Sequence, residues 1–370
     1  MPAVNRKRIT DLFVQLAKIN SPSFKERGLG EFVSGILRSE GCDVRFQEYG
    51  ESFNLIAYKK GAESSRQPIM LSAHLDTIEP TDGIIIDVNE NAVRSAGPTV
   101  LGADDKSAVA QIIEALRMLN EHEVKHGDIE IVLTSAEETG LIGAKNLDYS
   151  MIKSRHALVL DSGGRVGRAV VSAPTHYTYK MVVKGRSAHA GIEPEKGINA
   201  ITAAAKVITA LPDGRIDSET TANIGIISGG TATNVVPKEV FIRAEMRSRN
   251  AGTLESLKNE IFESARSAAS VCGAEIEITG QEEYAAFNIS SDDQFLKYIE
   301  SVFRSCGIEP ELSSTGGGSD ANIFNKNSIT AINISNGMQS VHSTDEFILI
   351  EDLCRGAEIV FCAVRDFVAA

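Results

Sequence analysis

The sequence has few cysteines, no block of basic residues and no long apolar run, and each absence argues against a class of protein. Its five cysteines are dispersed, odd in number and free of any CxxC pair. This pattern favours buried, reduced thiols over a disulfide framework or a thiolate metal site. The formal net charge is −13, with no run of five or more Lys or Arg, which argues against the phosphate-binding surface of a nucleic-acid-binding protein.

The apolar runs are too short to span a bilayer, so the sequence predicts no membrane-spanning segment. Residues 4–19 carry apolar side chains at helical spacing with basic residues between them, and they lack the continuous apolar centre of a signal peptide. We therefore expect a cytoplasmic protein with neither a nucleic-acid nor a membrane partner.

At 370 residues with 42% hydrophobic content, the chain can bury a full core and is long enough for two domains. Nearly continuous apolar segments indicate strands that are covered on both faces, with helices between some of them. These strands are predicted at residues 53–58, 68–73, 129–134 and 157–160, and a helix at 106–119. Ahead of them, Ser23 and Glu26 have the spacing of a capping box that would open a helix continuing to about residue 38. The pattern predicts an α/β fold.

The pattern changes between residues 173 and 284, where strands and helices follow one another in the order βαββαβ. The predicted elements are residues 177–183, 198–211, 222–227, 240–247, 254–269 and 275–279. This is the order of a ferredoxin-like unit. We interpret residues 173–284 as an inserted lid, in a main domain built from residues 1–172 and 285–370.

Acidic residues and histidines stand at the ends of several predicted strands of the main domain. They occur in the motifs Ala73-His74-Leu75-Asp76, Gly102-Ala103-Asp104-Asp105-Lys106, Ala136-Glu137-Glu138-Thr139-Gly140, Leu160-Asp161-Ser162-Gly163 and Val341-His342-Ser343. Ligands of open α/β sheets collect outside the carboxyl ends of the strands. The motifs therefore predict a ligand site at that edge of the sheet.

Each motif has an ordinary alternative when it is taken alone. His74 and Asp76 would point to the same side of a continuing strand, so that one could bind a metal while the other orients it, but such spacing is common in loops. The other acids could be helix caps, solvated strand ends or turn residues. Independent caps and turns have no reason to converge on one sheet edge, so we favour a single metal site.

The charges of the set suit two divalent cations. Three carboxylates, Asp104, Glu138 and Asp161, would together with one hydroxide balance two divalent cations. His74 and His342 would be neutral ligands. A mixture of imidazole and carboxylate suits Zn²⁺, with Co²⁺ or Mn²⁺ as possible substitutes.

Over nearly its whole length the chain resembles the dinuclear zinc exopeptidases, the family of peptidase T, aminoacylase and glutamate carboxypeptidase. The most specific motifs are residues 102–106, Glu137 with Glu138, and the loop Gly-Arg-Ser-Ala-His-Ala-Gly at 185–191. Aspartate at position 161, where the desuccinylases carry glutamate, resembles the peptidase T branch. The resemblance implies a catalytic domain with a mixed sheet flanked by helices, and a lid that also serves as a dimerisation domain.

The resemblance implies that two zinc ions share one ligand. His74, Asp104 and Asp161 would bind one ion, and Asp104, Glu138 and His342 would bind the other.

The resemblance also implies roles for the neighbours of these ligands. Glu137 would be the general base and then the general acid, as a metal-bridging water attacks the scissile amide. Asp76 would orient His74, and the peptide bond between Asp104 and Asp105 would be cis.

In the lid, similar enzymes place substrate contacts at positions that match His189, Asn234 and Arg247. His189 would stabilise the oxyanion in a partner subunit's site, which implies a homodimer joined through the lids. Gly317 and Gly318 would let the backbone approach the substrate closely, although a flexible turn is the alternative. The remaining histidines are expected to be structural: His122, His126, His156 and His176.

The expected reaction is the hydrolysis of an amide in a short peptide, as in a tripeptide aminopeptidase. An N-acyl-amino-acid amidohydrolase or a carboxypeptidase is the alternative, with Arg247 on the product carboxylate. It stays open because Ser313-Ser314-Thr315 stands where peptidase T carries an arginine. A non-catalytic metal- or peptide-binding protein is disfavoured, since Glu137 and all five ligands are present.

Overall fold

The computed structural model describes residues 2–62 and 67–367, and within them the chain forms two compact units. The second unit comprises Ser172–Asn288 and the short stretch Thr315–Gly318, and the first comprises the rest of the described chain. The ends of the inserted unit lie close to the predicted boundaries at 173 and 284. Its additional stretch, Thr315–Gly318, was not predicted.

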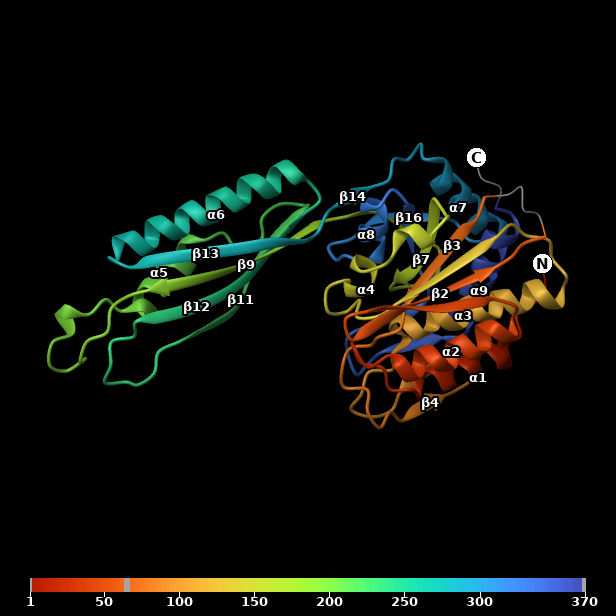
Figure 1. The fold of residues 1–370 in the computed structure, drawn as a ribbon, viewed down its shortest axis with the longest axis horizontal. Coiled ribbons are helices and arrows are strands. Elements are labelled where there is room, and N and C mark those ends of the chain that lie inside the picture. Colours follow the sequence, from red (N-terminus) through yellow and green to blue (C-terminus); the bar gives the residue numbers. More distant parts are fainter. Residues whose placement is uncertain (1, 63–66, 368–370) are drawn as a thin grey trace. The chain divides into compact units, whose positions relative to one another are not determined.

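The first unit is built on a mixed sheet (Figure 1). Its strand order is β1-β2-β6-β3-β7-β16-β8-β14, with β15 also paired to β8. The strands are β1 (Asp43–Tyr49), β2 (Ser52–Lys59), β3 (Ile69–His74), β6 (Ile129–Thr134), β7 (His156–Ser162), β8 (Arg168–Ala173), β14 (Phe287–Asn288), β15 (Glu311–Ser314) and β16 (Thr330–Ser335). The central strands β6, β3, β7 and β16 run parallel. Every residue of β3 and β6 is buried, as their continuous apolar runs predicted.

Helices flank this sheet (Figure 1), and the first unit also contains a smaller sheet. The helices are α1 (Arg6–Ala17), α2 (Arg27–Ser39), α3 (Ala103–Glu121), α4 (Ile142–Lys145), α7 (Gln294–Ser305), α8 (Asp320–Lys326) and α9 (Ile350–Arg365). The smaller sheet has the order β17-β18-β5-β4, formed by Met338–Gln339, Phe347–Leu349, Ala92–Ser95 and Ile86–Val88. Helix α3 is buried along most of its length and packs against α1, α9 and β3. It carries two of the predicted acids at its start.

The capping box predicted at Ser23 and Glu26 is wrong. Helix α2 begins at Arg27, and no side chain caps it. The Ser23 hydroxyl instead donates to Asp76 Oδ2 at 2.7 Å, and Glu26 Oε1 accepts the backbone N–H of Ala136 at 2.9 Å. Both side chains are used by neighbours of the predicted metal site, which local sequence spacing cannot reveal.

The second unit has the predicted βαββαβ order. Its main elements are β9 (Thr175–Lys184), α5 (Ala200–Ala210), β11 (Thr220–Gly229), β12 (Glu239–Ser248), α6 (Ala251–Val271) and β13 (Glu275–Tyr284), with a short β10 (Gly214–Arg215). The antiparallel sheet has the order β10-β11-β12-β9-β13. Residues of α5 and α6 pack with the inward side chains of these strands in a core of its own. The ferredoxin-like prediction is confirmed.

Two further predictions concern the whole chain. All five cysteines are free, three of them buried and two partly buried, as expected for reduced thiols. In the part of the chain that the structure describes, no helix is both long and apolar enough to cross a membrane.

Candidate metal centre

The predicted ligands come together at the carboxyl ends of the parallel strands. His74 is the last residue of β3, and Asp161 lies one residue before the end of β7. Glu138 follows β6, and Asp104 lies at the start of α3. Parallel strands end at the same edge of a sheet, so residues distant in sequence meet there.

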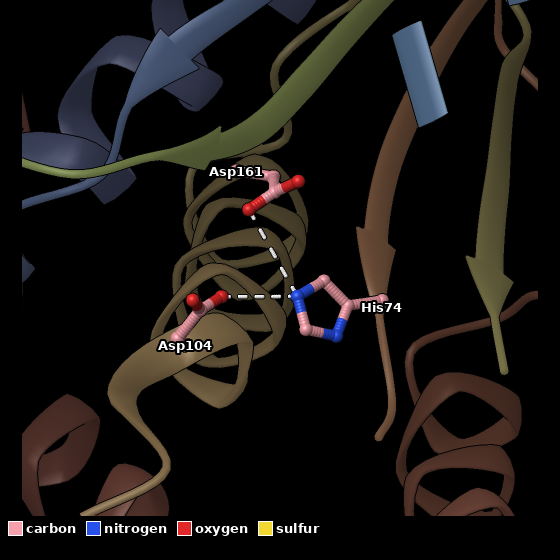
Figure 2. A group of neighbouring side chains, drawn as sticks. All are labelled: His74, Asp104 and Asp161. Atoms are coloured by element: carbon pink, nitrogen blue, oxygen red, sulfur yellow. Dashed lines mark hydrogen bonds and ion pairs between the residues drawn. The ribbon is translucent and has the colours of Figure 1, made fainter. Parts of the chain in front are cut away.

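The first ligand group consists of His74, Asp104 and Asp161, whose ligand atoms lie within 4.8 Å of one another. His74 Nε2 is 3.0 Å from Asp104 Oδ1 and 3.9 Å from Asp161 Oδ1. Figure 2 shows both carboxylates turned toward the same imidazole nitrogen. Three donor atoms in this arrangement could hold one cation.

The second ligand group shares Asp104 with the first and adds Glu138 and His342. His342 Nε2 lies 3.3 Å from Asp104 Oδ2 and 3.1 Å from Glu138 Oε1. The two oxygens of Asp104 thus face different histidines, His74 through Oδ1 and His342 through Oδ2. The donor set fits two cations with a shared carboxylate.

The electrostatics of the site also favour cations. Burial raises the pKa of Asp161 well above its ordinary value, and the nearby Asp104 raises it further. Burial would also raise the pKa of Asp104, but hydrogen bonds with His342 and His74 hold it below its ordinary value. Hydrogen bonds to Asp104 and Glu138 raise the pKa of His342 to about 10. Divalent cations would take over the charge compensation that these protons supply.

Glu137, the predicted general base, lies next to Glu138, a candidate metal ligand, and is buried. Burial raises the pKa of Glu137 well above its ordinary value, and Asp161 contributes in the same direction. Its backbone N–H donates to Asp76 Oδ1 at 2.9 Å. The preceding residue, Ala136, has φ 52°, a left-handed conformation that sets the direction of the turn.

Asp76 contacts His74 but also has a role that the sequence did not predict. His74 Nδ1 is 2.9 Å from the Asp76 main-chain oxygen and 3.4 Å from its carboxylate. The carboxylate accepts the backbone N–H groups of both Glu137 and Glu138, at 2.9 and 3.1 Å. Asp76 therefore links the His74 segment to the turn that carries Glu137.

Other residues support the site and were missed. Asn333 Oδ1 accepts the Asp161 N–H at 2.9 Å, and its amide donates to the Asp161 carbonyl at 2.7 Å. Asp105, joined to Asp104 by a cis peptide bond as the resemblance implied, accepts from Asn336 Nδ2 at 2.8 Å. The only local signal in the sequence was that Asn333 is a polar residue inside the apolar run of β16.

A buried carboxylate from a distant segment also reaches the site. Glu346 accepts backbone N–H groups from Leu101, Gly102 and Asp104. Burial raises the pKa of Glu346 to about 7. No motif in the sequence pointed to it.

In the second unit, the structure brings the segments of His189 and Asn234 together. The Ala190 N–H donates to the Asn234 carbonyl at 3.0 Å, and His189 forms a bridge with Val235. Both His189 and Asn234 are exposed. Their side chains are therefore available to a ligand.

Arg247, also in the second unit, is already paired. Its Nε and a terminal nitrogen each donate to Glu245 at 3.1 Å, and Glu245 also contacts His176 Nε2 at 2.8 Å. The Arg247 guanidinium lies 3.4 Å from the carbonyl of Gly316 in the late glycine-rich turn. His176, expected to be structural, thus belongs to the Arg247 cluster.

The two predicted glycines differ. A Cβ at Gly318 would lie 2.3 Å from the Tyr284 ring, whereas one at Gly317 would meet only Thr315 Oγ1 at 3.8 Å. Gly318 is therefore required by packing within the unit. Only Gly317 has the open surroundings that backbone contact with a substrate needs.

Comparisons with known proteins identify the family. Residues 173–271 match a peptidase dimerisation domain of the M20 type, and residues 54–210 match peptidase family M28. The structure of aminopeptidase PepT from Bacillus cereus is similar with a TM-score of 0.91 and 35% identity, covering 98% of each chain. This chain belongs to the peptidase T-like M20 peptidases. It is a hydrolytic metallopeptidase, as the resemblance implied.

Two further relatives carry peptidase names, and a third is similar over nearly its whole length. A tripeptidase from Staphylococcus aureus is similar with a TM-score of 0.94 and 30% identity, covering 98% of this chain and 99% of the other. Peptidase T of Escherichia coli K12 is 25% identical over 74% of this chain and 67% of its own length. The protein YqjE of Bacillus subtilis is 38% identical over 98% of this chain and 99% of its own.

Proposed function

We propose that this peptidase is a dinuclear zinc tripeptide aminopeptidase. The observation that carries the proposal is the pair of ligand groups sharing Asp104, with Glu137 directly beside them. Imidazole and carboxylate donors in this ratio suit Zn²⁺, with Co²⁺ or Mn²⁺ as possible substitutes.

His74, Asp104 and Asp161 would hold one ion, and Asp104, Glu138 and His342 the other. Bound zinc would supply polarisation of the scissile carbonyl and a lowered pKa for the attacking water.

The protein's own groups would manage the protons. Glu137 would take the proton of the attacking water and deliver it to the leaving amine. Asp76 would hold the Glu137 turn in place through its hydrogen bonds to two backbone N–H groups. His189 would stabilise the oxyanion, and Asn234 would contact the substrate.

Two observations bear on which end of the peptide is recognised. The relatives include proteins named as an aminopeptidase and a tripeptidase, which supports a free amine on the substrate. Arg247, the carboxylate contact of the alternative acyl-amino-acid hydrolase or carboxypeptidase, already gives two N–H groups to Glu245. That pairing disfavours the alternative.

The match to a peptidase dimerisation domain supports a homodimer joined through the second unit. We also propose the cytoplasmic location that the sequence predicted.

One tripeptide in three forms tests the proposal: with free ends, with an acetylated amine and with an amidated carboxylate. We expect cleavage of the free and amidated forms, loss of activity with a chelator and its return with Zn²⁺. Cleavage of the acetylated form alone would favour the acyl-amino-acid hydrolase. Tight peptide binding without cleavage by the zinc-loaded protein would contradict the proposal that the protein hydrolyses peptides.

A further inference from the structure

Glu346 contacts the turn that carries the shared ligand. Its side-chain Oε2 accepts the N–H groups of Leu101 and Gly102, each at 2.7 Å, and Oε1 accepts the Asp104 N–H at 3.0 Å. Glu346 is only 1% exposed. One carboxylate therefore satisfies three backbone donors of a single turn.

This turn has few other ways to satisfy its donors. Gly102 is left-handed with φ 74°, and Asp104 has the non-helical angles φ −81° and ψ 101°. The first N–H groups of a helix have no acceptor within the helix, and buried N–H groups need a partner. The Glu346 carboxylate takes the place of the missing acceptors. It thereby fixes the backbone of the turn and the orientation of Asp104.

Glu346 also belongs to the segment of the second metal group. It lies four residues after His342, and its own N–H donates to the Ser343 carbonyl at 3.3 Å. The residue thus closes the turn after His342 with its backbone and holds the Asp104 turn with its side chain. His342 and Asp104 are the two ligands that face each other at 3.3 Å.

We propose that Glu346 is a positioning residue of the metal centre, which fixes the Asp104 turn against the His342 segment before a cation binds. The inference rests on the proposed metal site. Glu346 would contact neither substrate nor metal and would act through Asp104, as outer hydrogen-bond partners of metal ligands do elsewhere.

Glu130 offers a matched control in the same unit. It is also a buried glutamate, 3% exposed, and its carboxylate accepts the backbone N–H groups of Lys153 and Ser154 at 2.9 and 2.8 Å. It lies near the start of β6, whereas the metal groups gather beyond the ends of the strands. Substitution of Glu130 by glutamine therefore removes a comparable buried acceptor at a position distant from the metal centre.

The test compares Glu346→Gln and Glu130→Gln in the full-length protein. A glutamine side chain keeps the size, but its NH₂ group cannot accept, so at least one N–H of the Asp104 turn loses its partner. Zn²⁺ affinity is measured by competition with a coloured chelator, and the visible spectrum is recorded with Co²⁺. Thermal unfolding without metal reports the structural cost of each change.

We expect E346Q to weaken binding of at least one ion by roughly 10–100-fold and to alter the Co²⁺ spectrum. We expect E130Q to keep wild-type affinity and spectrum with a similar loss of thermal stability. Wild-type affinity and spectrum in E346Q would overturn the proposal, as would an equal loss of affinity in E130Q.

If E346Q does not fold, Glu346→Asp replaces it in the test. The aspartate keeps the negative charge, but its shorter side chain moves the carboxylate away from the N–H groups of the Asp104 turn. A folded E346D protein should bind Zn²⁺ severalfold more weakly, and wild-type affinity would overturn the proposal. The metal site itself is judged separately on the wild-type protein: if that binds no Zn²⁺, the proposed function fails, whereas tight wild-type binding with an unaffected E346Q rejects only the role of Glu346.

Discussion

The candidate residues of the first unit, apart from the exposed His342, are buried or partly buried and contact one another, whereas those of the second unit are exposed or paired elsewhere. His74 is 2% exposed and its Nε2 faces two carboxylates, while His189 and Asn234 lie on exposed loop segments. Strand ends in a packed sheet hold side chains rigidly, and surface loops adapt to a ligand. The comparison supports our proposal that the chemistry belongs to the first unit and substrate choice to the second.

Removal of the shared ligand should have the largest effect. We expect Asp104→Ala to lose tight binding of both ions and to lower activity by at least roughly a thousandfold, since each ligand group loses a member. His342→Ala should keep the ion of the first group. Metal analysis after gel filtration distinguishes the two variants, and a D104A protein that retains two ions would contradict the bridge.

Loss of the base should nearly abolish turnover without loss of metal. Glu137→Gln removes the proton acceptor but no ligand, so we expect a fall in kcat of roughly 10²–10⁴-fold with two ions retained. The neighbouring Glu138→Gln should instead lose affinity for one ion. Substantial kcat in E137Q would remove Glu137 from the mechanism.

Changes in the second unit should be smaller and should act on substrate binding. We expect Arg247→Ala to raise KM for a tripeptide only severalfold, because the loss of its pairing with Glu245 and of its contact with the Gly316 carbonyl loosens the turn next to Gly317, with unchanged metal content. Arg243→Ala is the control, since Arg243 lies on the same strand and makes no ion pair with any described residue. Steady-state kinetics measure both, and equal KM values for R247A and the wild-type protein would exclude a substrate role for Arg247.

The sequence allowed prediction of the parts whose signals are local. Continuous apolar runs marked β3 and β6 within one residue of their ends, and alternating elements marked the second unit. His74, Glu137, Glu138 and Asp161 stood after such runs, so the edge on which they meet followed from the topology of a parallel sheet. Asp104, which precedes a helix, and His342, which follows no predicted strand, were added from the charge balance and the family resemblance.

The supporting contacts could not be predicted, because they join segments far apart in the chain. Glu346 and Leu101 are 245 residues apart, and Asn333 and Asp161 are 172 apart. The capping box at Ser23 failed for the same reason, since its hydroxyl donates to Asp76 across 53 residues. In the folded protein, polar side chains form hydrogen bonds with residues that are near in space but distant in the chain. Local sequence spacing indicates only the partners that are near in the chain.

The central claim is a dinuclear centre that hydrolyses peptides, and zinc titration of the metal-free protein tests it most directly. Bound Zn²⁺ per chain and hydrolysis of a free tripeptide are followed in the same samples. We predict two tightly bound ions per chain, with tripeptide hydrolysis restored as the sites fill. Saturation at one ion, or full loading without hydrolysis, would contradict the claim.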